Sequence, residues 1–252
     1  MVLSFYFDKG DFAPLQQDAL VLEYAALGRR EAVLLAVCDG IGGLSEGEYA
    51  SSYVTMRIRD WFYGDYLKHV RRRHGRRRIE RDCLGMLYDC NRYLLLYGKE
   101  RGIRLGTTMT MAVLLGRRFP GLPFIPHAAR YMLFHAGDSR AYAIGKTCKK
   151  LTRDDSLGDH ALHRCIGSFP WQGVQKKWGR LRRGEKFLVC SDGFWGELEE
   201  KEIAESFGRE KGWGMRRKLT EAQAEKRLRK LGQTGRMRGE KDNQAAVCCI
   251  SD

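Results

Sequence analysis

Several features that would place a chain in a membrane, a zinc finger or a secreted scaffold are missing here. No apolar run approaches the roughly 20 residues that a membrane helix needs. The first residues contain no basic stretch followed by an apolar core, so we expect no signal peptide. Eight cysteines occur without one C-x-x-C pair, which argues against a zinc site or a disulfide framework. We therefore expect a soluble cytoplasmic protein whose cysteines are ordinary buried thiols.

The chain is strongly basic, and it contains enough apolar residues to form a core. Its 252 residues include 45 Lys and Arg against 31 Asp and Glu, a net charge of +14, and 43% are hydrophobic. Such a composition is typical of a globular protein. The positive charge favours anionic partners, namely phosphoproteins, nucleic acid or a membrane face. Because no repeat or Pro/Ser-rich linker divides the chain, we expect one domain over residues 1–252. We also expect the protein to be a monomer.

Apolar spacing predicts both helices and strands. Three- and four-residue spacing indicates helices at residues 46–70 and 79–99, joined by a tight turn near Gly75 and therefore antiparallel. Polar helical segments are predicted at residues 199–207 and 220–231. Strands are predicted at residues 20–24, 32–37, 107–115, 129–135, 140–144, 186–190 and 245–250. This order predicts an α+β fold with helices packed on antiparallel sheets.

Five aspartates stand where predicted strands begin or end: Asp18, Asp39, Asp138, Asp192 and Asp242. Any one of them is also a common turn initiator. Ends of neighbouring strands gather on one rim of a sheet, so the five carboxylates can converge. Converging carboxylates repel one another, and cations resolve that conflict. No histidine or cysteine motif stands nearby, and carboxylate ligands alone suit Mg²⁺ or Mn²⁺.

Six motifs occur in an order that matches a known family: "DGIGGLSEGEYAS", "GTTMTMAVLL", "HAGDSRAYAI", "LTRDDS", "FLVCSDGFW" and "KDNQAAVCCI". Over about residues 10–250 the sequence resembles the metal-dependent protein phosphatases of type 2C, in their bacterial form. The resemblance implies a four-layer α/β/β/α sandwich, in which two antiparallel β-sheets are flanked by antiparallel helix pairs. It also implies two metal ions at one rim, bridged by a water.

The resemblance implies a role for each residue at that rim. Asp39 would bridge both ions, and the backbone carbonyl of Gly40 would contact one of them. Asp192 and Asp242 would hold the other ion. Asp18 would act through a metal-bound water. Catalysis would then depend on Asp39, Asp192 and Asp242 through the bridging water.

The activity implied by the resemblance is hydrolysis of phosphoserine and phosphothreonine in phosphorylated proteins, a signal-transduction role. Two Mg²⁺ or Mn²⁺ ions would activate the water, so no phosphoenzyme would form. Asp138, in the "GDSR" element, would hold a third ion. No cysteine is followed by five residues and an Arg, which excludes a cysteine-nucleophile phosphatase. No G-x-x-x-x-G-K-[ST] loop occurs either.

Two departures from the family pattern stand out. The arginine that grips the substrate phosphate is missing, because Ala13 stands near its place. Lys9, Arg29, Arg30 or Arg164 are the candidate substitutes, and the sequence does not choose among them. The flap near residues 156–175 looks shortened.

Other functions stay open beside the phosphatase. The missing arginine favours a degenerate member that binds phosphoproteins as a regulatory module. The arginine-rich run Arg71–Arg78 is either a solvated corner between helices or a docking patch for an acidic partner. A nucleic-acid-binding protein ranks last, because it rests on charge alone and no aromatic residue interrupts the run.

Overall fold

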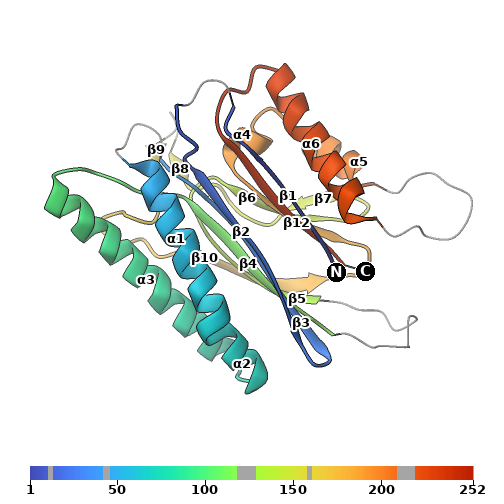
Figure 1. The fold of residues 1–252 in the computed structure, drawn as a ribbon, viewed down its shortest axis with the longest axis horizontal. Helices are drawn as coiled ribbons and strands as arrows, with labels where there is room; N and C mark the ends of the chain where they lie inside the picture. Colours follow the sequence, from blue (N-terminus) through green and yellow to red (C-terminus); the bar gives the residue numbers. More distant parts are fainter. Residues whose placement is uncertain (11–13, 42–45, 118–128, 158–160, 209–218, 252) are drawn as a thin grey trace, which may run out of the picture.

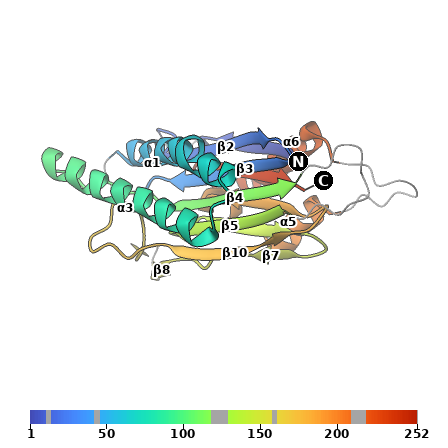
Figure 2. The same cartoon turned by 90° about the horizontal axis from the view of Figure 1, so that it is seen from below.

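Two five-stranded antiparallel sheets form the centre of the molecule. The computed structural model describes residues 1–10, 14–41, 46–117, 129–157, 161–208 and 219–251. One sheet has the order β1 (Val2–Asp8), β12 (Gln244–Ile250), β11 (Lys186–Cys190), β6 (Arg140–Ile144), β7 (Cys148–Lys150). The other has the order β10 (Gln175–Leu181), β5 (Ala129–Ala136), β4 (Met109–Arg117), β3 (Arg30–Asp39), β2 (Asp18–Leu27), visible side by side in Figure 2. A short ribbon pairs β8 (Ser156–Leu157) with β9 (Ala161–Leu162).

Helices cover the outer face of each sheet (Figure 1). On the β2–β10 sheet lie α1 (Gly47–Trp61) and α3 (Arg76–Arg101), and α1 continues through a π-helical turn η1 (Phe62–Tyr66) into α2 (Leu67–Arg71). On the β1–β7 sheet lie α5 (Glu200–Ser206) and α6 (Glu221–Met237), beside the single turn α4 (Asp192–Trp195). None of the described helices, α3 included, combines the length and the apolar character of a bilayer span.

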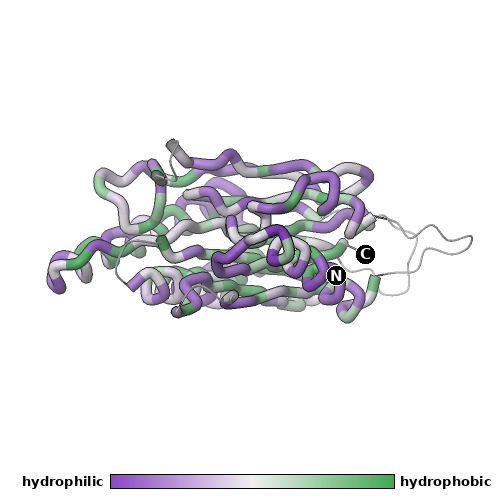
Figure 3. Tube along the Cα trace, turned by 90° about the horizontal axis from the view of Figure 1, so that it is seen from above, coloured by the Kyte–Doolittle hydropathy of each residue, from purple (hydrophilic) through white to green (hydrophobic). Residues whose placement is uncertain are grey.

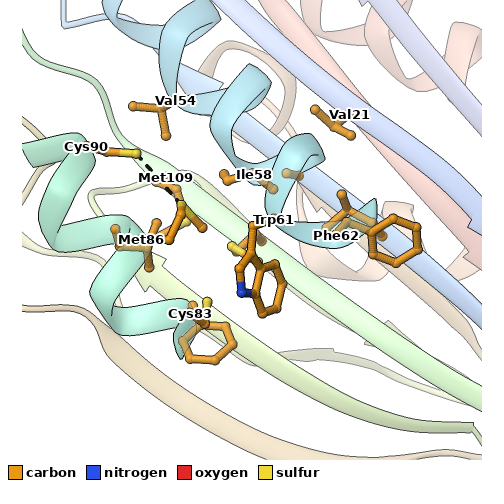
Figure 4. Packing of buried hydrophobic residues seen from close by; sticks show 14 of the residues in the cluster. Val21, Val54, Ile58, Trp61, Phe62, Cys83, Met86, Cys90 and Met109 are labelled. Atoms are coloured by element: carbon orange, nitrogen blue, oxygen red, sulfur yellow. Dashed lines mark hydrogen bonds between the residues drawn. The ribbon is translucent and has the colours of Figure 1, made fainter. Parts of the chain in front are cut away.

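Three hydrophobic clusters fill the spaces between these four layers. The side chains of strand β3 alternate between two of these clusters, because successive residues of a strand point to opposite faces of the sheet. Val33, Leu35 and Val37 pack between the sheets, whereas Leu34 and Ala36 pack under α1 and α3. Figure 4 shows the cluster under α1 and α3. Figure 3 shows hydrophilic segments gathered on the outside of the molecule. Burial on both faces explains the uninterrupted apolar run of this strand.

The observed elements match the predicted α+β sandwich, and they differ from the predictions in detail. Of the four edge strands in the two five-stranded sheets, the sequence patterns singled out β2 but not β1, β7 or β10. The long helix predicted at residues 46–70 is interrupted by the π-helical turn η1. The turn predicted at Gly75 is made instead by Arg73, which takes the left-handed conformation at φ 55°, while Gly75 is the N-cap of α3. Cys83 and Cys90 are fully buried on one face of α3, and all eight cysteines are free thiols.

Candidate metal centre

The five predicted aspartates lie along one rim of the sandwich. Asp18 begins β2 and Asp39 ends β3, and the two face each other in the strand register. Asp192 is the first residue of α4, just after β11, and Asp242 precedes β12. Asp138 lies in the turn between β5 and β6, where the chain crosses from one sheet to the other. Carboxylates from both sheets therefore lie along this rim.

Three of these carboxylates come together closely. Asp39, Asp138 and Asp192 each offer an oxygen atom, and these oxygens lie within 4.8 Å of one another. All three residues are half-buried. Such a group of oxygen donors matches the ligand chemistry of Mg²⁺ and Mn²⁺.

The negative charges of the rim aspartates repel one another. Burial, followed by Asp192 and Asp18, raises the pKa of Asp39 well above its usual value. Burial also raises the pKa of Asp18 to about 8 and that of Asp138 to about 6, with Asp192 contributing to both. For Asp242 the pKa is raised by burial and then by Asp192. Carboxylates that resist ionisation together are stabilised when a cation neutralises them, so the residues present fit a divalent metal.

Two threonines just before β4, Thr107 and Thr108, fix the position of Asp39. The backbone N–H of Asp39 donates to Thr108 Oγ1 over 3.0 Å, and the Asp39 carbonyl accepts from Thr107 Oγ1 over 2.8 Å. Thr108 Oγ1 also shares a hydrogen bond of 2.8 Å with Ser139 Oγ, next to Asp138. These side chains tie two rim aspartates to one strand.

Gly40 lies where the rim meets helix α1. Its N–H donates to the Gln17 carbonyl over 3.1 Å. A Cβ at this position would lie 2.5 Å from the backbone of Gly47, the first residue of α1. Only glycine allows this close approach between the end of β3 and the start of α1. The metal contact of the Gly40 carbonyl stays a prediction.

Ser191 and Asn243 join the two sheets at the rim. Ser191 Oγ donates to Asp18 Oδ2 over 2.7 Å and accepts from the N–H of Ala245 over 2.9 Å. Asn243 Oδ1 accepts from the N–H of Gln17 over 2.7 Å, and its Nδ2 donates to the Lys9 carbonyl over 2.7 Å. Sequence reasoning missed both residues, although each adjoins a predicted ligand.

The candidate phosphate ligands are scattered. Arg29 and Arg30 lie at the turn between β2 and β3, at the opposite end of β2 from Asp18. At about 3.3 Å per residue that strand spans roughly 30 Å, so neither arginine reaches the rim. Arg164 is engaged in an ion pair of 2.8 Å with Asp155. Lys9 lies near the rim through its carbonyl bond to Asn243.

The segment predicted as a shortened flap is anchored beside the rim. Thr107 and Ile166 exchange two backbone hydrogen bonds of 3.0 and 2.9 Å. Asn91 of α3 accepts from the N–H groups of Gly167 and Ser168 over 2.7 and 3.0 Å. Ala13, which stands near the place of the missing arginine, falls outside the described residues. The flap therefore connects α3 with the strand that positions Asp39.

Comparison by sequence finds no protein-family profile and no curated protein that match the chain. Comparison of structures finds solved phosphatases that match over nearly the full length of both chains. The serine/threonine phosphatase Stp1 from Staphylococcus aureus has 21% identity and a TM-score of 0.73, and covers 100% of this chain and 96% of its own. The catalytic domain of the serine/threonine protein phosphatase PstP, solved with two manganese ions, has 22% identity and a TM-score of 0.67, with 99% and 98% covered.

A third match is PppA, described as a key regulatory component of the type VI secretion system in Pseudomonas aeruginosa. It has 20% identity and a TM-score of 0.70, with 99% of this chain and 96% of that chain covered. These likenesses confirm the predicted sandwich of two antiparallel sheets with flanking helices. The chain has the fold of the bacterial serine/threonine phosphatases of type 2C.

Proposed function

We propose that this chain is a Mg²⁺- or Mn²⁺-dependent phosphatase that hydrolyses phosphoserine and phosphothreonine in proteins. The observation that carries the proposal is the convergence of oxygens from Asp39, Asp138 and Asp192 within 4.8 Å. This group lies at one rim of a fold shared with proteins named as phosphatases, one of them solved with two manganese ions.

We propose the following roles for the rim residues. Asp39 would hold both ions, and the Gly40 carbonyl would contact one of them. Asp192 and Asp242 would share one ion. Asp138 would hold a third ion. Asp18 would support Asp39 across the β2–β3 ladder and, through Ser191, connect it to the other sheet.

When bound, the divalent cations supply a water of lowered pKa and neutralise charge on the phosphoryl oxygens. The chain contributes the rigid rim that orients these partners, held by Thr107, Thr108 and Ser191. Attack by water on phosphorus forms one P–O bond, breaks the ester P–O bond, and releases the serine or threonine hydroxyl with a proton.

A covalent route through a thiol is disfavoured by the surroundings of the two nearest cysteines. Cys38 and Cys190 adjoin rim residues, and both are fully buried. Burial raises the pKa of each thiol well above its usual value, and the thiol form is a poor nucleophile. Hydrolysis without a phosphoenzyme therefore suits this chain.

The direct test is hydrolysis of a phosphothreonine peptide with Mn²⁺, with Mg²⁺ and with EDTA. We expect metal-dependent turnover in the wild type and loss of at least about a hundredfold in Asp192→Asn, the scale of removing a group that supports transition-state charge. Asp60→Asn is the matched control, because Asp60 lies exposed on α1, and it should keep full activity. Equal activity in Asp192→Asn would contradict the proposed site.

A second candidate function is a regulatory module that binds phosphoproteins without turnover. It is favoured by the positions of Arg29 and Arg30, which lie at the opposite end of β2 from the rim, and by the ion pair that engages Arg164 with Asp155. Phosphopeptide binding by metal-loaded protein that does not hydrolyse peptide or aryl phosphate would move this function to first place.

The proposed setting of the protein is the cytoplasm, where it would act on phosphorylated proteins as a monomer. Its eight free cysteines support a reducing compartment. Shared hydrophobic clusters between successive layers support one domain over residues 1–252.

A further inference from the structure

A basic pocket lies far from the metal rim. It has a volume of about 620 Å³ and sits between the β2–β3 turn and the end of α2. Figure 1 shows these two segments at the same end of the molecule. The lining residues are Ala26, Leu27, Gly28, Arg29, Arg30, Val70, Arg71 and Arg73. Because the rim aspartates stand at the other end of the same hairpin, the pocket is a separate site.

Four arginines and no acidic residue line this pocket. Among the described residues, no ion pair neutralises Arg29, Arg71 or Arg73. Arg30 Nη1 donates to the Val70 carbonyl over 2.9 Å, which fastens the hairpin to the end of α2. Like charges gathered on a concave surface repel one another and attract an anion.

The corner between α2 and α3 is held in place without a ligand. His69 lies between two side chains, with its Nδ1 2.7 Å from His74 Nδ1 and its Nε2 2.6 Å from Asp82 Oδ2. The His74 N–H also donates to the His69 carbonyl over 3.0 Å. This network connects the loop to α3, so the backbone that carries Arg71 and Arg73 is held in place by the chain itself.

Arg73 takes an unusual backbone conformation within that corner. Its φ of 55° lies in the left-handed region, which is unfavourable for a residue other than glycine. Gly75, two positions later, has an ordinary negative φ. The chain thus carries an arginine where glycine would relieve strain, and this arginine lines the pocket.

The lining also has an apolar part, formed by Ala26, Leu27 and Val70. A guanidinium group recognises carboxylates through paired hydrogen bonds, and the apolar part suits a hydrocarbon side chain. No aromatic residue lines the pocket for base stacking. We propose that this pocket docks an acidic segment of a protein partner, in which an apolar side chain is flanked by Asp and Glu.

The test is binding of a short fluorescein-labelled peptide, with Leu flanked by Glu and Asp, measured by fluorescence anisotropy without any turnover. The test variant joins Arg71→Ala with Arg73→Gly, because glycine accepts the left-handed conformation. The control variant joins Lys226→Ala with Lys230→Ala, exposed residues on α6 that lie on the other outer layer. Both variants remove the same charge, and thermal unfolding confirms that both fold.

We expect the arginine variant to bind the peptide about tenfold more weakly, the scale of losing charge-assisted contacts, while the lysine variant binds as the wild type does. Replacing the peptide's Leu with Gln should also weaken binding. The proposal is overturned if both variants lose affinity equally, if the wild type does not bind the peptide, or if inorganic phosphate or duplex DNA binds the pocket in its place.

Discussion

Asp18 and Asp39 face each other as direct partners in the antiparallel ladder of β2 and β3. Like charges in directly opposite positions destabilise a sheet. Burial and the neighbouring aspartates raise the pKa of both carboxyl groups. The pair therefore carries an electrostatic cost in the fold, which the proposed cations would reduce.

In metal-free wild-type protein, the free energy of unfolding should fall as pH rises. Asp18→Asn should remove this dependence on pH. The pKa of Asp18 is about 8 in the fold, above the ordinary 3.8. Between these values the native state holds a proton that the unfolded state releases, so stability falls as pH rises from about 4 to about 8. The Asn variant should show a flatter profile in urea unfolding with EDTA.

The control for this experiment is Asp60→Asn, which should keep the wild-type profile because Asp60 is exposed on α1. Addition of Mn²⁺ should raise the unfolding midpoint of the wild type, since a ligand of the native state stabilises it. A profile in Asp18→Asn as steep as that of the wild type would contradict the prediction.

Gly193→Ala should push apart the two segments that carry Asp192 and Asp242, which are proposed metal ligands. A Cβ at Gly193 would lie 2.2 Å from the Asn243 carbonyl oxygen and 3.1 Å from Asp242 Cβ. We expect a loss of roughly 1–3 kcal/mol in stability from overpacking, with weaker Mn²⁺ binding in calorimetric titration. Gly235→Ala in α6 is the matched control, because its nearest neighbour would be 3.4 Å away. Equal behaviour of the two variants would show that the close approach at Gly193 is unimportant.

Asn243→Ala should loosen the connection between the N-terminal segment and the rim. The substitution leaves the N–H of Gln17 and the carbonyl of Lys9 without their side-chain partner. We expect a cost of roughly 1–3 kcal/mol in the free energy of unfolding, together with weaker metal binding. Denaturant unfolding and metal titration measure the two effects. Gln233→Ala, at an exposed position of α6, should change neither, and an unaffected Asn243→Ala would contradict the role given to this side chain.

His135 should make the protein sensitive to acid. Burial lowers its pKa from 6.5 to about 4, against the opposing effect of Asp155. Its Nε2–H donates to the Arg153 carbonyl over 3.1 Å, because a carbonyl can only accept. The lowered pKa keeps the ring neutral near neutral pH, and its Nδ1 then accepts from Thr110 Oγ1 over 2.7 Å. Below pH 6.5 the unfolded state binds a proton that the native state does not, and stability falls until about pH 4.

The expected slope approaches roughly 1.4 kcal/mol per pH unit for this one proton. His135→Asn should flatten the profile of unfolding free energy in that window, whatever its stability at neutral pH. His163→Asn, at an exposed position, should keep the wild-type slope. A variant at His135 that retains the full slope would assign the acid sensitivity to another group.

Strong local patterns were sufficient to predict much of the fold. The core strands β3, β4, β5, β6, β11 and β12 lie within a few residues of their predicted bounds, because apolar runs buried on both faces are distinctive. Three of the four edge strands, β1, β7 and β10, were missed for the opposite reason. β10 reads Gln-Lys-Lys-Trp-Gly-Arg-Leu and has a mostly half-exposed side-chain pattern, which a polar loop shares.

The rim aspartates could be nominated from the sequence because each adjoins a strand end, which is a local property. Their supporting side chains could not. Ser191 contacts Asp18 across 173 positions, and Asn243 contacts Gln17 across 226 positions. Arg29 and Arg71 likewise meet in one pocket only because β2 and β3 end beside α2. The order of residues determines local periodicity and the choice of ligand atoms, whereas the pairing of distant strands determines which of those atoms meet, because packing free energy depends on the whole chain at once.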